Sequence, residues 1–261
     1  MLSYQHHFHA GNAADVHKHA LLSVMLAYMT QKDKPLSYLE THAGRGVYDL
    51  GAEHARKTAE ADAGIVRAEA RGWFAPDHPY AQVLARARSL WGTRAYPGSP
   101  AIAGLMLRAG DKINLAELHP AEVDVLGDVM AGFGAHIHAQ DGFAMARALT
   151  PPMPRRGVLL VDPSYEVKSD YETLPDFLRG IHRKWNVGVL ALWYPLLESG
   201  AHKSMLAALD AAELPGALRH EVLFGPARPG HRMVGSGLFI VNAPYGLEQE
   251  AKRLGRLFAK G

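Results

Sequence analysis

The sequence predicts an α/β protein built on a mostly parallel sheet that is covered by helices. Short apolar runs alternate along the chain with segments of helical periodicity, which is typical of strand–helix–strand units. Several of these runs end in polar or glycine-containing stretches. Because ligands of open α/β sheets bind outside the carboxyl ends of the strands, the fold class also indicates where a functional site should lie.

The first expected elements are a helix and a strand that leads into a glycine turn. Asn12 can cap a helix that begins after it, and Asp15 favours the positive end of that helix. Residues 36–40 form a short apolar run before Gly44 and Gly46, so we expect the first strand there. The helix should bury the apolar side chains that recur at helical spacing, namely Val16, Ala20, Leu21, Val24 and Tyr28.

Residues 48–95 interrupt the alternation of strands and helices. They are rich in Ala, Arg and Glu, contain no convincing strand, and separate the first strand from the second by far more than one crossover helix. We therefore expect an inserted helical subdomain over residues 48–95 and a main domain formed by residues 1–47 and 96–261.

The alternation resumes after this segment. Ser99-Pro100 is a strong helix start, with serine as the cap and proline in the first turn, and Gly110 is expected to end that helix. Residues 247–258 have the pattern of a closing amphipathic helix. The remaining strands are expected at residues 113–118, 135–139, 158–161, 187–193 and 238–241.

Composition restricts the class of protein without identifying it. The chain has 261 residues, of which 48% are hydrophobic and 21% charged, as in packed soluble proteins. The absence of cysteine excludes disulfides and thiolate metal sites and fits a reducing cytoplasm. No window approaches the roughly 20 apolar residues of a membrane span, and the first residues lack the pattern of a signal peptide. The net charge of +2 is compatible with an RNA partner but does not require one.

The most informative stretch is Asp162-Pro163-Ser164-Tyr165, which follows the apolar run at 158–161. It brings a carboxylate, a backbone carbonyl and an aromatic ring to the end of one buried strand. This set suits a flat base that carries an exocyclic amine, because Asp162 and the Pro163 carbonyl can each accept one N–H and Tyr165 can stack on the ring.

Carboxylates recur at the ends of other expected strands. Glu40 precedes the Gly44-x-Gly46 turn, Glu117 ends the second strand and Asp141 follows the third. Together with Asp162, these acids should lie along one edge of one sheet, where a carboxylate typically binds ribose hydroxyls. Because the third glycine of the dinucleotide fingerprint and a Walker lysine are both missing, a dehydrogenase and a phosphate-binding loop are disfavoured.

These motifs resemble those of S-adenosylmethionine-dependent adenine-N6 methyltransferases, and over nearly the whole chain those of the RlmJ-type 23S ribosomal RNA adenine-N6 methyltransferases. The resemblance implies a class I methyltransferase fold, a Rossmann-like mixed, mostly parallel sheet with helices on both faces and a small helical insertion. The matching stretches are residues 1–4 and 8–12, Asp15, Lys18-His19, Thr41-His42-Ala43-Gly44, residues 96–100 and 117–120, Asp141-Gly142-Phe143, Leu192-Trp193-Tyr194-Pro195 and Gly235-Ser236-Gly237.

The resemblance also implies roles for particular residues. Asp162, with Pro163 and Tyr165, would be catalytic, and Tyr4, Lys18 and Tyr165 would lie at the target base. The cofactor S-adenosyl-L-methionine would be bound by His19, His42, Gly44, Ser99, Glu117, Asp141, Gly142 and Asp162. The family usually has a second proline where this chain has Ser164, so we expect a looser loop and slower base capture, but the same reaction.

Histidines near the N-terminus raise the alternative of a metal site. His6, His7, His9, His17 and His19 lack the i, i+4 spacing with a glutamate that a helical zinc pair requires, so no metal is expected. Candidate RNA contacts are the basic loop at 228–232, with Arg228, His231 and Arg232, and more weakly Arg56, Arg67, Arg86, Arg88, Arg155, Arg156, Arg179, His182, Arg183 and Lys184.

The function expected from these patterns is methylation of N6 of an adenine in 23S ribosomal RNA, in rRNA processing, by a cytoplasmic monomer. Three alternatives remain open at this point. The substrate could instead be an adenine in DNA or an amide nitrogen of a protein. A catalytically silent RNA-binding module on the same fold is the third, because Ser164 departs from the usual motif.

Overall fold

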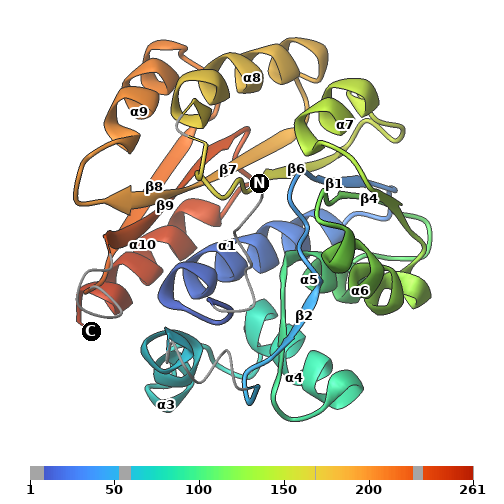
Figure 1. Cartoon of the computed structure of the whole chain (residues 1–261), viewed down its shortest axis with the longest axis vertical. Helices are drawn as coiled ribbons and strands as arrows, with labels where there is room; N and C mark the ends of the chain where they lie inside the picture. The colour runs from blue at the N-terminus through green and yellow to red at the C-terminus, as the bar shows by residue number, and fades with distance from the viewer. Residues whose placement is uncertain (1–8, 53–59, 168, 226–231, 261) are drawn as a thin grey trace.

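The structure is a computed structural model that describes residues 9–52, 60–167, 169–225 and 232–260 (Figure 1). A seven-stranded sheet with the order β5-β4-β1-β6-β7-β9-β8 forms its centre. The strands are β1 (Ser37–Glu40), β4 (Lys112–Ala116), β5 (Ala135–His138), β6 (Gly157–Val161), β7 (Val189–Leu197), β8 (Leu218–Leu223) and β9 (Met233–Val241).

Five neighbouring strands pair in parallel, and the last two pairings of the sheet are antiparallel. β5, β4, β1, β6 and β7 pair in parallel, whereas β9 pairs antiparallel with both β7 and β8. The expected mixed, mostly parallel sheet is therefore confirmed. The last predicted strand is too short, because β9 already begins at Met233, and β8 was not predicted.

The parallel strands are apolar because both faces of the sheet are covered. Every residue of β1 and of β6 is buried, which is typical of parallel strands that carry crossover helices on both sides. Glu40 at the end of β1 is in register with Leu115 of β4 and Leu160 of β6. The carboxyl ends of these three strands thus lie side by side.

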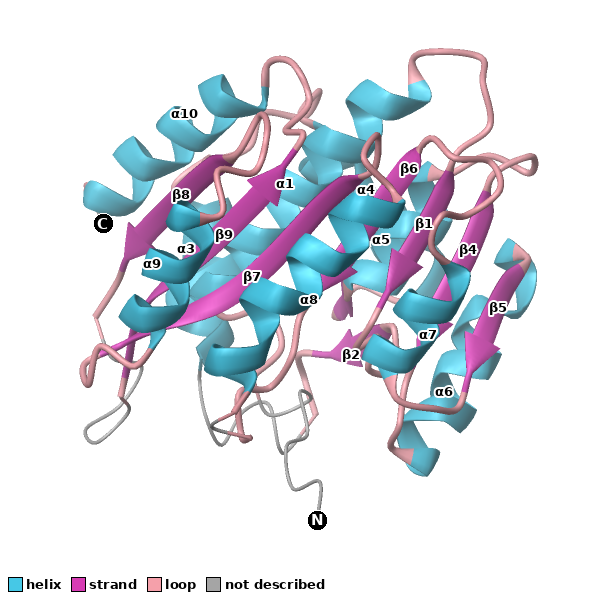
Figure 2. Cartoon of the chain, turned by 90° about the horizontal axis from the view of Figure 1, so that it is seen from above, coloured by secondary structure: helices cyan, strands magenta, loops and turns pink. Residues whose placement is uncertain are grey.

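Helices form one layer on each face of the sheet (Figure 2). One apolar cluster joins the sheet to α1 (Ala13–Thr30), α5 (Ser99–Met106), α6 (Pro120–Met130) and α10 (Leu247–Ala259). A second cluster joins the opposite face to α7 (Gly142–Leu149), α8 (Asp170–Lys184) and α9 (His202–Ala211). A short 3-10 helix, η3 (Ala131–Phe133), follows α6.

The helix starts follow the sequence signals. Asn12 caps α1 by accepting the backbone N–H of Asp15 at 2.9 Å, as expected. Helix α5 begins at Ser99 with Pro100 in its first turn, but the expected serine cap is wrong, because Gly98 is the N-cap and the Ser99 hydroxyl donates to Glu40 instead. The helix ends at Met106, because Leu107 already has an extended backbone, and not at Gly110.

The segment after the glycine turn contains η2 (Asp62–Val66), α3 (Arg67–Ala70) and α4 (Pro79–Trp91), flanked by β2 (Val47–Asp49) and β3 (Ala95–Pro97). The strands β2 and β3 form an antiparallel ribbon that the sequence pattern did not indicate. Gly64 lies so close to α1 that a Cβ there would be 2.1 Å from the Gly11 carbonyl oxygen. Apolar side chains of η2 and α4 belong to the same cluster as those of α1.

Candidate active site

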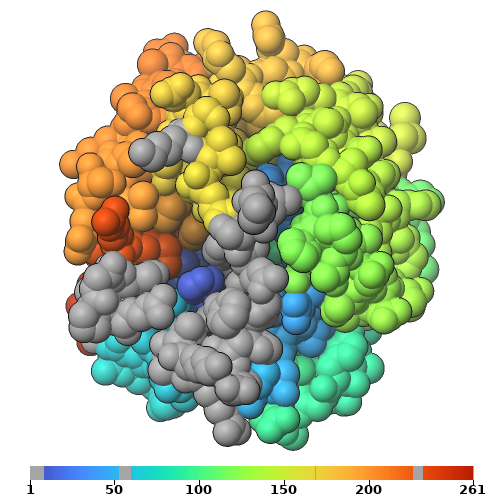
Figure 3. All heavy atoms as spheres, in the orientation of Figure 1, coloured from blue at the N-terminus to red at the C-terminus, as the bar shows by residue number. Residues whose placement is uncertain are grey.

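A cavity of about 590 Å³ opens at the carboxyl edge of the parallel strands. Its wall consists of the loops that follow β1, β4, β5 and β6, the first half of α1, and the end of β7. Segments far apart in sequence, among them the yellow segment after β6 and the green segment after β4, approach one another on this face of the molecule (Figure 3). The expectation that the strand-end residues share one edge is confirmed.

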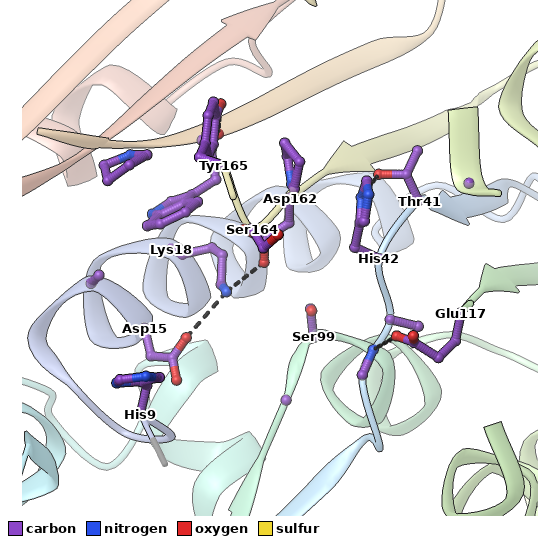
Figure 4. A pocket seen from close by; sticks show the side chains of 18 of the residues that line it. His9, Asp15, Lys18, Thr41, His42, Ser99, Glu117, Asp162, Ser164 and Tyr165 are labelled. Carbon is purple, nitrogen blue, oxygen red and sulfur yellow. Dashed lines mark hydrogen bonds and ion pairs between the residues drawn. The ribbon is translucent and has the colours of Figure 1, made fainter. Parts of the chain in front are cut away.

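Asp162, which follows β6, is held by a lysine from α1 (Figure 4). The Lys18 ammonium donates to Asp162 Oδ2 at 2.7 Å and lies 3.1 Å from Asp15 Oδ1. Burial lowers the pKa of Lys18, but Asp162 and Asp15 outweigh it and raise the pKa above its usual value, so the lysine remains charged. The three side chains together carry one net negative charge at the floor of the cavity.

Glu117 stabilises the glycine turn after β1. Its Oε2 accepts the Gly44 N–H at 2.8 Å, and its Oε1 accepts the N–H groups of Leu118 and His119 at 2.8 Å each. Gly44 has φ +61, a conformation that favours glycine, and a Cβ there would lie 2.5 Å from the Tyr48 hydroxyl. A carboxylate offers about four acceptor positions, so three amide donors leave room for one more.

Asp141 and Gly142 form the start of α7 beside this turn. Asp141 Oδ1 caps the helix by accepting the Ala144 N–H at 2.7 Å. A Cβ on Gly142 would lie 1.8 Å from the Thr41 carbonyl oxygen, so only glycine lets the helix approach the end of β1 so closely. The Asp141 carboxylate, the start of α7 at Gly142 and the glycine turn at Gly44 thus lie together on one side of the cavity.

Glu40 does not face the cavity, although it ends a strand at the same edge. Its side chain is fully buried and accepts hydrogen bonds from Ser99 Oγ and, at 2.8 Å, from Tyr38 Oη. Burial raises the pKa of Glu40 to about 8, although both hydrogen bonds act in the opposite direction. Glu40 therefore supports Ser99, which does line the cavity.

His42 and His19, both expected to bind the cofactor, differ in exposure: His42 is partly buried and His19 is buried. The His42 imidazole is hydrogen-bonded to Thr41 Oγ1 at 2.7 Å and packs edge-on against Phe143. Burial lowers the pKa of His42, despite the nearby carboxylates, so the ring is neutral at pH 7. His19 is 1% exposed and hydrogen-bonded to the Tyr96 hydroxyl at 2.9 Å, and it borders the cavity from below.

Pro163, Ser164 and Tyr165 continue the wall after Asp162. Tyr165 has φ +56, in the left-handed region that residues other than glycine rarely adopt. Its hydroxyl donates to the Trp193 carbonyl at 2.7 Å, and its ring lies 4.7 Å from that of Tyr171. Burial raises the pKa of Tyr165 well above its usual value, so the phenol stays neutral.

Sequence reasoning assigned no role to two residues that complete this wall. Asp15, interpreted only as a favourable acid in the first turn of a helix, contacts Lys18. Trp193 borders the cavity from the middle of β7. The sequence signal that could have identified Trp193 is its position as an aromatic residue at the end of the strand expected at 187–193. Tyr165 was singled out for a similar position after the strand expected at 158–161.

Several expected RNA contacts lie away from the cavity. Arg156 donates to backbone carbonyls of Met29 and Lys34, at the amino edge of the sheet. Arg155 lies beside it, and α8 runs toward that edge, because Trp185 just after it donates to the Arg155 carbonyl. This placement removes Arg155, Arg156, Arg179, His182, Arg183 and Lys184 from the surroundings of the cavity.

Other candidates are engaged in the protein or lie outside the described residues. Arg86 donates to the Leu105 carbonyl at 2.5 Å, and Arg88 pairs with Glu69 at 2.6 Å. Tyr4, His6, His7, Arg56, Arg228 and His231 lie outside the described residues, whereas Arg67 and Arg232 are described.

The described residues contain neither a candidate metal site nor a candidate membrane span. Over residues 9–52, 60–167, 169–225 and 232–260, no group of three or more His, Asp or Glu side chains could hold a metal ion. Within the same ranges, no helix combines the length and the apolar character that crossing a membrane requires.

Comparisons with known proteins agree with the motifs. The family described as "Ribosomal RNA large subunit methyltransferase D, RlmJ" matches residues 33–260. Proteins named ribosomal RNA large subunit methyltransferase J are similar to this chain. The one from Escherichia coli is 40% identical over 96% of this chain and 90% of its own length. The one from Haemophilus influenzae is 34% identical over 97% and 92%.

A solved structure supports the same relationship. The protein LPL1258 from Legionella pneumophila superposes with a TM-score of 0.86 at 33% identity, covering 97% of this chain and 93% of that protein. Since the family match spans most of the chain and the relatives cover nearly all of it, this chain belongs to the RlmJ family of ribosomal RNA large subunit methyltransferases.

Proposed function

We propose that this protein transfers a methyl group from S-adenosyl-L-methionine to N6 of an adenine in 23S ribosomal RNA. The observation that carries the proposal is the position of Asp162, at the end of β6, in a cavity large enough for a nucleobase and a cofactor. Membership of the RlmJ family supports the same reaction. We further propose that the protein acts as a monomer in the cytoplasm.

The cavity suits S-adenosyl-L-methionine in both shape and charge. Glycines at 44 and 142 leave backbone groups accessible where any side chain would collide. Glu117 and Asp141 offer carboxylate acceptors to hydroxyl and amine groups. When bound, this cofactor supplies an electrophilic methyl group on a positively charged sulfur. The neutral His42 adds no repulsive charge beside it, and the net negative group of Asp15, Lys18 and Asp162 favours a cation.

The remaining cofactor contacts would come from Ser99 and His19. Ser99 is held by Glu40, and His19 by Tyr96, so both side chains have fixed orientations before any ligand binds. Preorganised contacts of this kind reduce the ordering cost of binding.

Asp162 and Pro163 would bind the exocyclic amine of the target adenine. The lone pair of that nitrogen is delocalised into the ring, and hydrogen bonds from its two N–H groups to the Asp162 carboxylate and the Pro163 carbonyl favour a pyramidal, more nucleophilic nitrogen. Asp162 can then accept the proton that leaves. Lys18 orients the carboxylate, and the ring of Tyr165 would support the base, with Tyr4 as a further contact.

Positioning supplies much of the rate in such a site. Well-aligned intramolecular reactions gain roughly 7–11 kcal/mol over their bimolecular equivalents. Extrusion of the adenine from a helix costs a few kcal/mol, and it costs least for an unpaired base. We therefore expect a target that is unpaired or weakly paired.

A parallel methylation assay tests the substrate. Three reactions each contain the purified protein and isotopically labelled cofactor. The first also contains naked 23S rRNA, the second genomic DNA and the third a protein extract. We expect label in the rRNA, recovered as N6-methyladenosine. Label only in DNA or protein would replace the substrate, and absence of label in all three would favour a silent binding module.

A further inference from the structure

Trp193 forms the part of the cavity wall that contacts both Lys18 and Tyr165. Lys18 Nζ lies 5.7 Å from the centre of the indole ring, and the Tyr165 ring packs edge-on against it at 6.1 Å. The Tyr165 hydroxyl also donates to the Trp193 carbonyl at 2.7 Å. A rotation of the indole would displace its contacts with the Lys18 ammonium and with the Tyr165 ring, whereas the hydrogen bond to the backbone carbonyl would remain.

A chain of buried polar side chains ends on this indole. Trp193 Nε1 donates to Ser236 Oγ at 2.9 Å, and the same oxygen lies 2.9 Å from His17 Nδ1. His17 Nε2 lies 2.9 Å from His220 Nδ1. His17 and Ser236 are both 0% exposed, so water cannot replace these partners.

One set of hydrogen-bond directions satisfies every group of this chain with a neutral His17. An indole N–H can only donate, so Ser236 Oγ accepts from it and has its own hydrogen to give to His17 Nδ1. The other nitrogen of His17 then donates to His220 Nδ1. Burial, and to a lesser extent the neighbouring His220, lower the pKa of His17 well below its usual value, so His17 is neutral as this arrangement requires.

The fold brings Trp193, Ser236, His17 and His220 together from four elements. Ser236 in β9 is opposite Pro195 in β7, so it is the diagonal neighbour of Trp193 on the same face of the sheet. His17 comes from α1, immediately before Lys18, and His220 comes from β8. Two consecutive residues of α1 thus supply the lysine that pairs with Asp162 and the imidazole that is hydrogen-bonded to Ser236.

A chain that only stabilised the fold would not need to end at the cavity. Buried polar groups stabilise little in net terms, and apolar side chains of the same shape often serve as well. We propose that Ser236, His17 and His220 are positioning residues that fix the plane of the Trp193 indole and, through it, the contacts of Lys18 and Tyr165. This inference rests on the proposed function, since it assigns these residues to the methyl-transfer site.

The test is a double-mutant cycle between Ser236→Ala and Trp193→Phe. Ser236→Ala should lower kcat/KM for 23S rRNA about three- to tenfold, as expected for one lost hydrogen bond. In the Trp193→Phe background the same change should have less than about a twofold effect, because the indole that it acts through is gone. The matched control is Ser37→Ala, which removes another fully buried serine, hydrogen-bonded to the Pro154 carbonyl, at the amino edge of the sheet.

A spectroscopic measurement makes the test independent of activity. In protein labelled with 5-fluorotryptophan, the ¹⁹F resonance of Trp193 is assigned by its loss in Trp193→Phe. We expect Ser236→Ala to shift or broaden that resonance, His220→Leu to do so more weakly, and Ser37→Ala to leave it unchanged.

The outcomes separate the two proposals. Equal losses of kcat/KM for Ser236→Ala in both backgrounds, or an unchanged Trp193 resonance, would overturn the positioning role. Absence of methyl transfer to rRNA by the wild-type protein would instead contradict the proposed function, while the resonance would still decide the positioning role.

Discussion

The ends of β1 and β6 hold their carboxylates in opposite ways. Glu40 is fully buried, surrounded by hydroxyl donors, and its pKa is raised to about 8 by burial. Asp162, on the neighbouring strand, borders the cavity and is paired with the charged Lys18. Both acids lie at the carboxyl edge of the sheet, Glu40 opposite Leu160 and Asp162 two residues further along, but one supports the wall and the other lines the cavity.

The difference comes from what approaches each strand end. Ser99 at the start of α5 lies above Glu40 and shields it, whereas α1 offers Asp162 a lysine and leaves its other side open. Position at the carboxyl edge alone therefore does not bring an acid into the cavity, and the neighbouring helix decides whether it lines the cavity or is buried behind the wall.

The largest expected effect is at Asp162. Asp162→Ala should reduce methyl transfer by more than about 10³-fold, because a positioned acid–base group contributes roughly 10²–10⁴-fold and one amine contact is lost as well. Cofactor affinity, measured by calorimetry, should fall far less than activity, because Glu117, Asp141 and the glycine turn after β1 remain. Substantial activity in this variant would show that the two strand ends do not differ in the way proposed.

Lys18 should have the next largest effect. Lys18→Met leaves Asp15 and Asp162 without their shared cation. Loss of one partner of a buried ion pair strongly destabilises the folded state, because the remaining charge is left uncompensated. We expect kcat to fall about 10- to 100-fold, since such a pair orients the carboxylate. The exposed Lys252, paired with Glu248 on α10, provides the control Lys252→Met, which should retain nearly full activity.

The pH dependence of stability tests the other strand end. Because the pKa of Glu40 is about 8 in the folded protein and near 4.5 in the unfolded chain, only the folded protein holds this proton in between. Its contribution to the free energy of unfolding therefore falls as pH rises from about 4.5 to 8, by at most about 1.4 kcal/mol per pH unit. Glu40→Gln should remove this slope.

Urea unfolding at pH 5, 6.5 and 8 measures the effect of Glu40→Gln. The wild-type protein should lose stability relative to the variant as the pH rises. Parallel curves for the two proteins would mean that Glu40 is ionised in the folded state, and its contrast with Asp162 would disappear.

The smallest effect is expected at Ser164. Ser164→Pro restores the proline that the family usually has and narrows the conformations of the loop, which is worth about 0.4–1 kcal/mol where the backbone is compatible. We expect kcat/KM for rRNA to rise about two- to fivefold, mainly through KM, since this energy corresponds to that factor. A decrease would show that this chain uses a different loop geometry.

Much of the fold follows from local sequence patterns. The apolar runs at β1, β4, β5, β6 and β7, the cap at Asn12 and the Ser99-Pro100 helix start were sufficient to predict a mostly parallel sheet with its polar residues on one edge. That edge contains Asp162, Glu117 and Asp141 because parallel strands must end together.

The remaining features depend on contacts between distant segments. Strand β8 pairs on one side only and mixes polar with apolar residues, so its pattern is weak. The ribbon of β2 and β3 has three residues a strand and forms only once the segment between them folds back. The pairing of Lys18 with Asp162 joins residues 144 positions apart, which no local pattern encodes.

Nucleoside analysis of 23S rRNA tests the central claim most directly. Cells that lack this protein are complemented with the wild-type chain or with Asp162→Ala, and the adenosines of their 23S rRNA are compared by mass spectrometry. The account predicts that one N6-methyladenosine is lost on deletion, restored by the wild-type chain and not restored by the variant. Restoration by Asp162→Ala would contradict the role of this carboxylate.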